Sequence, residues 1–322
     1  MKKALVIGID NYGDHASLTG CINDANSVGD LLETHGDGSP NFEVIRLLDV
    51  WTKAELRSAV ATLFSGEVDT ALLYFSGHGF VNELGGYIIT PDFQQYDEGV
   101  SMEDILKWAN RSGIKDKIII LDCCHSGAMG NPKIVDGATH LKQGVTILTA
   151  SREDEAAIEI NGHGVFTNLL LEALRGGAAD LRGHISPGSI YAFVDQALGA
   201  WDQRPMFKTN VKRFTSLRTV PPAVPPETLR KIIEYFPAPQ HELPLDPSFE
   251  DTNTPQTAHT LKEPYADKTN VAVFKHLQKF QSVGLVTPVG EEYMYFAAMH
   301  GRSCRLTALG YHYWRLVKEK KI

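Results

Sequence analysis

The chain has 322 residues, of which 43% are hydrophobic and 22% are charged, and this composition excludes a predominantly disordered protein. The formal net charge of −8 argues against wholesale binding to nucleic acid or to an acidic membrane. No apolar run approaches the roughly 18 residues that a membrane helix requires, and the four cysteines do not form the framework of a disulfide-rich secreted domain. We therefore expect a soluble cytoplasmic protein that does not associate with membranes.

From Met1 to about Leu217, apolar runs of strand length alternate with amphipathic helical segments. This pattern is typical of an α/β fold, a mostly parallel sheet flanked by helices on both faces. Thr52 and Glu55 have the spacing of a capping box at the start of the second helix. The predicted strands are 4–9, 42–48, 70–75, 117–121, 145–149 and 206–214, and the predicted helices are 22–34, 53–64, 102–110, 166–174 and 189–197.

A proline-rich stretch at 221–226 ends this alternation, and 236–264 has no periodicity, so we interpret 218–268 as a linker or extended strap. After it, 271–283 and 306–318 are predicted helices, and 293–298 with 304–306 is a predicted hairpin. That order resembles the end of a winged-helix domain. The sequence thus predicts a first domain over 1–217, a strap over 218–268, and a small α+β winged-helix-like domain over 269–322.

Two motifs directly follow buried strands of the first domain, Ser76-Gly77-His78-Gly79 and Asp122-Cys123-Cys124-His125-Ser126-Gly127. The carboxyl ends of parallel strands are where functional residues of open α/β sheets gather. A free thiol with a pKa of about 8.5 is mostly protonated at neutral pH and needs a neighbouring base to become a nucleophile. We predict that His78 is this base for Cys124, and that the amides of Gly79 and Cys124 form an oxyanion hole.

Taken in order, several further segments extend this pattern, and residues 1 to about 217 resemble the caspase/metacaspase superfamily of cysteine peptidases. The segments are 8–12, 18–25, 76–79, 122–127, 149–151, 164–167 and 203–207. The resemblance is nearer to the metacaspase and prokaryotic caspase-like branch, and it implies a caspase-like, flavodoxin-like three-layer fold. It assigns the nucleophile to Cys124 and leaves Cys123 as a minor alternative.

The resemblance also implies a specificity pocket, lined by Cys21, Asp24, Ser76 and Asp122. Two carboxylates suit a guanidinium or an ammonium group, so we expect cleavage after Arg or Lys in protein substrates with exposed basic sites. The arginine-rich pocket and the glutamine-alanine-cysteine motif of caspases proper are not visible in this chain.

Metal binding has little support in the sequence. Metacaspases often bind calcium through clustered aspartates, but the acidic residues between 92 and 104 lack the spacing of an EF-hand loop. The adjacent Cys123 and Cys124 fit the spacing of zinc ligands badly. We therefore predict no cofactor and no metal ligand, with calcium as the weakly supported alternative.

The C-terminal region and the strap suggest regulation. Few basic residues accompany the winged-helix-like segment, and Glu291 and Glu292 lie beside it, which favours a protein partner or autoinhibition over nucleic acid. The strap and the loop 128–142 are candidate cleavage sites for an upstream activating protease. Appended domains of this kind occur in prokaryotic defence and cell-death proteases. The rival interpretation is a catalytically silent scaffold that binds protein or DNA through its C-terminal domain.

Overall fold

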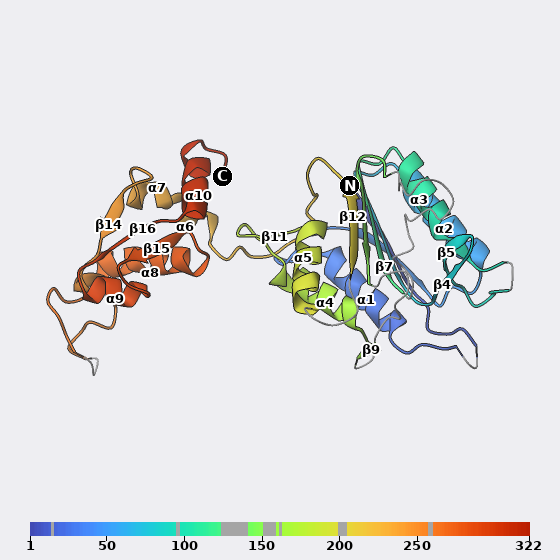
Figure 1. Ribbon diagram of the computed structural model, residues 1–322, viewed down its shortest axis with the longest axis horizontal. Helices are drawn as coiled ribbons and strands as arrows, with labels where there is room; N and C mark the ends of the chain where they lie inside the picture. The colour runs from blue at the N-terminus through green and yellow to red at the C-terminus, as the bar shows by residue number, and fades with distance from the viewer. Residues whose placement is uncertain are drawn as a thin grey trace. The chain divides into compact units, whose positions relative to one another are not determined.

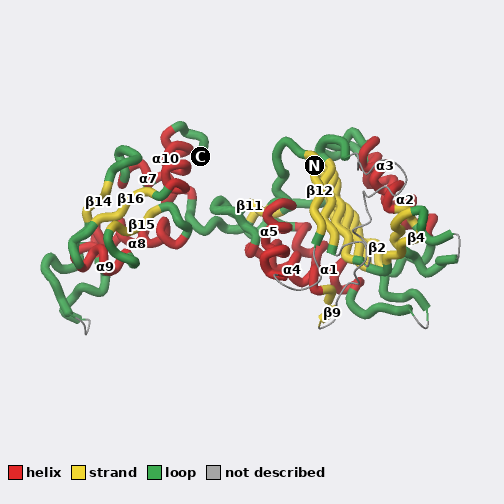
Figure 2. Tube along the Cα trace, in the orientation of Figure 1, coloured by secondary structure: helices red, strands yellow, loops and turns green. Residues whose placement is uncertain are grey.

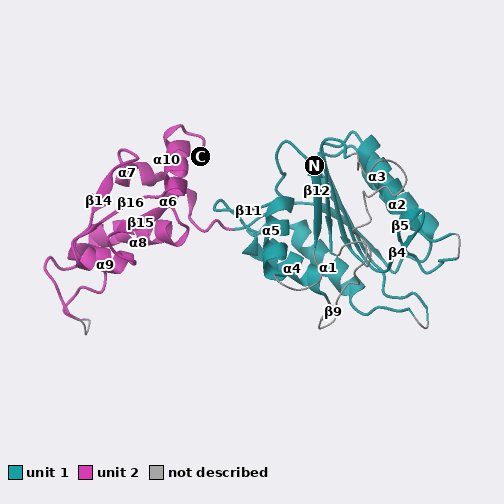
Figure 3. Cartoon of the chain, in the orientation of Figure 1, with its two compact units in different colours: residues 1–220 teal, residues 221–322 magenta. Residues whose placement is uncertain are grey.

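The computed structural model describes residues 1–13, 16–94, 97–123, 141–150, 159–160, 163–198, 205–256 and 260–322. The chain divides into two compact units, Met1–Val220 and Pro221–Ile322 (Figure 3). None of the helices within the described ranges is both long enough and apolar enough to cross a membrane.

A six-stranded sheet forms the centre of the first unit, in the order β12-β8-β7-β3-β1-β2 (Figure 2). The apolar runs of its four central strands are buried on both faces, as expected of strands covered by helices. Five strands of this sheet, β1, β2, β3, β7 and β8, are parallel, and β12 is antiparallel to β8. The strand bounds are Lys2–Gly8 (β1), Glu43–Leu48 (β2), Thr70–Ser76 (β3), Asp116–Asp122 (β7), Val145–Thr149 (β8) and Met206–Asn210 (β12).

Helices cover both faces of this sheet (Figure 1). One face carries α1 (Cys21–Glu33), α4 (Val165–Glu172) and α5 (Pro187–Leu198), and the other carries α2 (Lys53–Ser65) and α3 (Met102–Arg111). The three-layer α/β fold predicted from the sequence is therefore confirmed. The Thr52 half of the capping box predicted for α2 is confirmed as well, since the Glu55 amide donates to the Thr52 hydroxyl at 3.2 Å.

The carboxyl ends of β1, β3 and β7 are in register. Gly8 pairs with Ser76, and Ser76 pairs with Asp122, so the three residues form one row at the edge of the sheet. A Cβ at Gly8 would lie 2.2 Å from the Cys21 carbonyl oxygen, so only glycine lets α1 begin against this edge. The Asp10 carboxylate accepts the first amides of α1, from Cys21 at 2.8 Å and from Ile22 at 3.3 Å.

Short elements complete the first unit. A three-stranded sheet of β4 (Gly79–Asn82), β5 (Gly85–Ile88) and β6 (Val100–Ser101) follows the His78 motif, and the sequence did not predict it. Its strands have only two to four residues, too few for alternation to be visible. The remaining elements are β9 (Glu159–Ile160), β10 (His163–Gly164), a π-helical turn (Ala173–Gly177), β11 (His184–Ile185) and β13 (Arg218–Thr219).

The second unit contains a three-stranded antiparallel sheet in the order β14-β16-β15, together with helices. Much of the expected strap between 218 and 268 is ordered within it, since the segment contains two short helices and a strand. The Asn253 side chain is fully buried and donates to the carbonyls of Pro247, Lys262 and Pro264. The bounds are Pro226–Arg230 (α6), Ile232–Tyr235 (α7), Glu242–Pro244 (β14), Pro247–Phe249 (a 3-10 turn), Lys268–Ser282 (α8), Val286–Val289 (β15), Met294–Met299 (α9), Ser303–Leu306 (β16) and Ala308–Lys318 (α10).

The predicted hairpin in this unit is wrong. Residues Met294–Met299 form helix α9, and β16 pairs with β14 and β15 instead. Met294, Ala297 and Ala298 are buried, which is the spacing of one helix face, and the aromatic residues between them misled the strand prediction. Winged-helix character stays a prediction.

Candidate active site

The site is built at the edge where β1, β3 and β7 end. In the strand order the chain turns back at β1, since β2 lies on one side of it and β3 on the other. Open α/β sheets bind ligands at such a switch point. Three predicted pocket residues lie there, Asp24 on α1, Ser76 at the end of β3 and Asp122 at the end of β7, with exposed fractions of only 1%, 3% and 5%.

Neutral donors orient the Asp24 carboxylate. Its Oδ2 atom accepts the Ser76 hydroxyl at 3.5 Å and the Gly164 amide at 3.3 Å. The fourth predicted pocket residue, Cys21, is also buried, with an exposed fraction of 4%. Burial raises the pKa of the Cys21 thiol well above its usual range, so this cysteine stays protonated and unreactive.

Asp122 is oriented by residues for which the sequence indicated no role. The Thr167 hydroxyl donates to Asp122 Oδ2 at 2.6 Å, and the Tyr74 hydroxyl lies 2.6 Å from the same Thr167 oxygen. Burial raises the pKa of Tyr74, so its hydroxyl remains a neutral donor. Thr167 belongs to a segment that the family resemblance singled out, and that resemblance was the only sequence signal for it.

His78 lies just beyond β3 and is held in one orientation. Its Nε2 atom is 2.6 Å from the Ala16 carbonyl oxygen. Because a carbonyl oxygen only accepts hydrogen bonds, Nε2 carries the proton, and in the neutral ring Nδ1 holds the lone pair. His78 is thus prepared to accept a proton at Nδ1, which is what a general base for a cysteine requires.

Tyr12 contacts both the backbone and the ring of His78. Its hydroxyl accepts the His78 amide at 2.9 Å and donates to the Ile89 carbonyl at 3.3 Å, and the two rings have centroids 4.5 Å apart. A Cβ at Gly77 would lie 2.4 Å from the Tyr12 hydroxyl, so glycine is required for this contact. Tyr12 is a positioning residue, and it lies in segment 8–12, which the family resemblance singled out without giving Tyr12 a role.

The predicted nucleophile, Cys124, lies outside the described residues, as do the residues after it up to 140. The alternative, Cys123, is described and has an exposed fraction of 1%. Ser76 and Asp122 are paired across β3 and β7, and in the sequence His78 comes two residues after Ser76 and Cys124 two residues after Asp122. Gly79, the other predicted oxyanion residue, is the first residue of β4. The dyad and the oxyanion hole therefore stay predictions.

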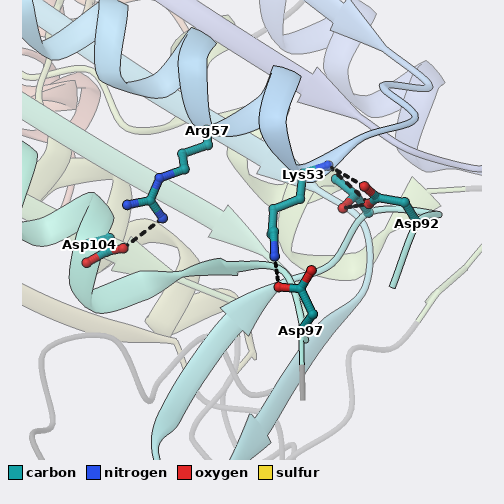
Figure 4. A network of polar contacts seen from close by, with 6 residues as sticks. Lys53, Arg57, Asp92, Asp97 and Asp104 are labelled. Carbon is teal, nitrogen blue, oxygen red and sulfur yellow. Dashed lines mark hydrogen bonds and ion pairs between the residues drawn. The ribbon is translucent and has the colours of Figure 1, made fainter. Parts of the chain in front are cut away.

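Three of the acidic residues between 92 and 104, namely Asp92, Asp97 and Asp104, have partners on α2 (Figure 4). Asp92 accepts the backbone amide of Lys53 at 3.0 Å, and the Lys53 ammonium forms an ion pair with Asp97. Arg57 pairs with Asp104 at 2.8 Å. Within the described ranges, no group of three or more histidine, cysteine, aspartate or glutamate side chains is arranged to hold a metal ion.

Comparisons with known proteins agree with this architecture. The family model described as the caspase domain matches residues 1–215. Metacaspase-1 of Saccharomyces cerevisiae is 30% identical over 148 residues, covering 40% of this chain and 34% of the yeast protein. Metacaspase-1B of Aspergillus fumigatus is 28% identical over 193 residues, covering 54% of this chain and 47% of that protein. The chain therefore spans about a third to a half of the length of these relatives.

The fold is shared with solved structures. A crystal structure of a protein from Geobacter sulfurreducens aligns with a TM-score of 0.50 at 17% identity, covering 68% of this chain and 99% of that protein. At this identity the similarity concerns the fold alone.

Proposed function

The chain belongs to the caspase family, and we propose that it is a cysteine endopeptidase that hydrolyses peptide bonds after arginine or lysine in protein substrates. The observation that carries this proposal is the pair of buried carboxylates, Asp24 and Asp122, beside the strand that leads into His78. A buried acidic pocket next to a histidine base with its Nε2 proton fixed suits a basic side chain and acyl transfer.

The proposed reaction has two stages. His78 Nδ1 takes the proton of the Cys124 thiol, and the thiolate attacks the scissile carbonyl carbon to give a tetrahedral intermediate. The amides of Gly79 and Cys124 stabilise its oxyanion. Collapse breaks the carbon–nitrogen bond, and the histidinium returns the proton to the leaving amine. Water, deprotonated by His78, then hydrolyses the thioester and releases the acid and the Cys124 thiol.

The substrate side chain is proposed to enter the pocket lined by Cys21, Asp24, Ser76 and Asp122. The protonated Cys21 and the Ser76 hydroxyl add no charge of their own, so the two carboxylates dominate the local field. This arrangement favours a cation and opposes an aspartate side chain, which would meet like charge.

We propose that catalysis requires no metal. Two acidic residues between 92 and 104 are engaged by the protein's own cations, Asp97 by Lys53 and Asp104 by Arg57. A calcium ion that bound there would have to displace these ion pairs. Activity that survives a chelator, and that added calcium does not increase, would agree with this.

The second unit is proposed to bind a regulatory protein, in a cytoplasmic defence or cell-death pathway. Its surface exposes aromatic side chains, including Tyr293 at 54%, Phe296 at 44% and Tyr311 at 45%. Exposed aromatic side chains are enriched at protein interfaces, whereas nucleic-acid binding needs a basic surface. Activation by an upstream protease or by a partner is part of the proposal.

The test is turnover of fluorogenic peptides that end in Arg, Lys, Asp or Leu, measured with the full chain in a chelator and in calcium. We expect cleavage after Arg and Lys, and a loss of at least about a thousandfold in Cys124→Ala and in His78→Ala. Cys123→Ala is the matched control and should retain activity within about tenfold. Full activity in Cys124→Ala would refute the proposal, and a folded but inactive wild type in every condition would favour the scaffold.

A further inference from the structure

The start of α4 contacts both carboxylates of the pocket. Gly164 caps this helix and Thr167 lies in its first turn. The Gly164 amide donates to Asp24 Oδ2, and the Thr167 hydroxyl donates to Asp122 Oδ2. The first turn of α4 therefore orients two acidic side chains from different layers, Asp24 on helix α1 and Asp122 at the end of strand β7.

The hydrogen bonds on the Asp122 side have a defined direction. An ionised carboxylate only accepts, so Thr167 gives its hydroxyl proton to Asp122, and Tyr74 gives its own to Thr167. Tyr74 and Thr167 are fully buried. Hydrogen bonds in such a chain strengthen one another in a low dielectric, and the Asp122 side chain is consequently held in one rotamer.

Close packing against Gly164 also restricts the spacing of the two carboxylates. A Cβ at Gly164 would lie 2.4 Å from Asp122 Oδ2, so the carboxylate packs directly on the glycine backbone. Asp24 accepts the amide of this same residue. Asp122 therefore has no room to shift toward α4, and its distance from Asp24 is set by the backbone of one residue.

We propose that Thr167 determines the preference of this pocket for arginine over lysine. A guanidinium is planar and pairs with carboxylates through two parallel hydrogen bonds, so it requires a carboxylate of fixed orientation. An ammonium is a compact charge with rotatable donors and tolerates a carboxylate that turns. Thr167 is a positioning residue, and the inference rests on the proposed function because it concerns the same pocket.

The first test compares Thr167→Val, which keeps the shape and removes the hydroxyl, with Thr167→Ser, which keeps the hydroxyl. We expect Thr167→Val to lower kcat/KM on an Arg peptide by about ten- to a hundredfold and on the matched Lys peptide by less than about threefold. Thr167→Ser should restore the Arg-to-Lys ratio to within about threefold of wild type. Tyr74→Phe, which removes only the donor to Thr167, should lower the ratio in the same direction by a smaller factor.

An equal loss on both peptides in Thr167→Val, or an unchanged ratio, would overturn the inference, because a merely structural role lowers both rates alike. If Thr167→Val does not fold, as judged by circular dichroism, Tyr74→Phe decides the question by the same ratio.

A binding measurement separates this inference from the proposed function. Cys124→Ala, with and without Thr167→Val, is titrated with agmatine, a guanidinium, and with cadaverine, an ammonium. We expect Thr167→Val to weaken agmatine about tenfold and cadaverine by less than about threefold. If the wild type cleaves none of the peptides and the amines still bind with this pattern, the peptidase proposal fails and the role of Thr167 stands. If neither amine binds, or both weaken equally, the role of Thr167 is refuted.

Discussion

The two ends of the central sheet bury opposite charges. At the carboxyl edge, Asp24 and Asp122 accept hydrogen bonds from hydroxyl and amide groups. Toward the amino edge, Lys117 is 3% exposed and donates to the carbonyls of Ile114 and Gln143 at 2.9 and 3.0 Å. Arg218 is 9% exposed and donates to the carbonyls of Thr34 and Leu174.

The partners explain what each end does. The cations bond to main-chain carbonyls, which the fold supplies wherever a helix or strand ends, so their role is to complete the protein's own hydrogen bonds. Desolvation lowers the pKa of Lys117 and of Arg218, a cost that these carbonyls offset. The acids are instead oriented by side chains and a glycine from distant segments. Buried charge at one end stabilises the fold, whereas at the other end it lies in the candidate site.

Outside the predicted dyad, we expect the largest loss of activity from adding a methyl group at Gly164, beside the carboxyl ends of the strands. Gly164→Ala places a Cβ 2.4 Å from Asp122 Oδ2, and Thr167 prevents the carboxylate from moving aside. We expect kcat/KM on an Arg peptide to fall about a hundredfold, and stability to fall by about 1–3 kcal/mol. The control is Gly113→Ala, where a Cβ would contact nothing within 4 Å. Unchanged turnover in Gly164→Ala would show that the spacing of the carboxylates is not critical.

At the amino edge the expected effect is on stability alone. Lys117→Met removes the donor to two carbonyls, so we expect the free energy of unfolding to fall by about 1–3 kcal/mol while the ratio of Arg to Lys cleavage stays the same. Lys115→Met, an exposed neighbour, should change it by less than about 0.5 kcal/mol. Urea titration measures both. A changed cleavage ratio in Lys117→Met would contradict the separation of the two ends.

The difference in stability between the wild type and Lys117→Met should depend on pH. Because the pKa of Lys117 is lower in the folded state, the unfolded chain binds the proton more tightly, and stability from this group rises as pH increases from the folded pKa toward the unfolded value near 10.4. Wild type should therefore gain stability relative to Lys117→Met across that alkaline window. A constant difference between the two across the window would show that Lys117 is not desolvated in the folded protein.

The smallest effect should come from an exposed ion pair. Lys53→Met removes the ammonium that pairs with Asp97, whose side chain is 62% exposed (Figure 4). Solvent screens this pair, so we expect a loss below about 1 kcal/mol that shrinks further in high salt. Lys107→Met, which removes a similar pair with Glu103, is the matched control. A loss above about 2 kcal/mol in Lys53→Met would mean that the polar contacts of Lys53 hold the sheet of β4, β5 and β6 in place.

The central strands and the helices around them could be predicted from sequence because local patterns specify them. Apolar residues dominate the runs at 70–75, 117–121 and 145–149, and each became a buried strand with bounds within one residue. The end of β12 was missed by four residues, and its antiparallel direction is not encoded in its own composition. Direction depends on the connection that precedes a strand, which lies far along the chain.

For the site, the sequence by itself determined which chemistry-bearing residues exist and, through ordered motifs, that His78 and the four pocket residues belong to one edge. The bond between Thr167 and Asp122 joins residues 45 positions apart, and the bond between Gly164 and Asp24 joins residues 140 positions apart. The hydrogen bond between His78 and Tyr12 joins residues 66 positions apart. Only the tertiary structure decided these contacts, because hydrophobic periodicity specifies which face of an element is buried but not which distant side chain it meets there.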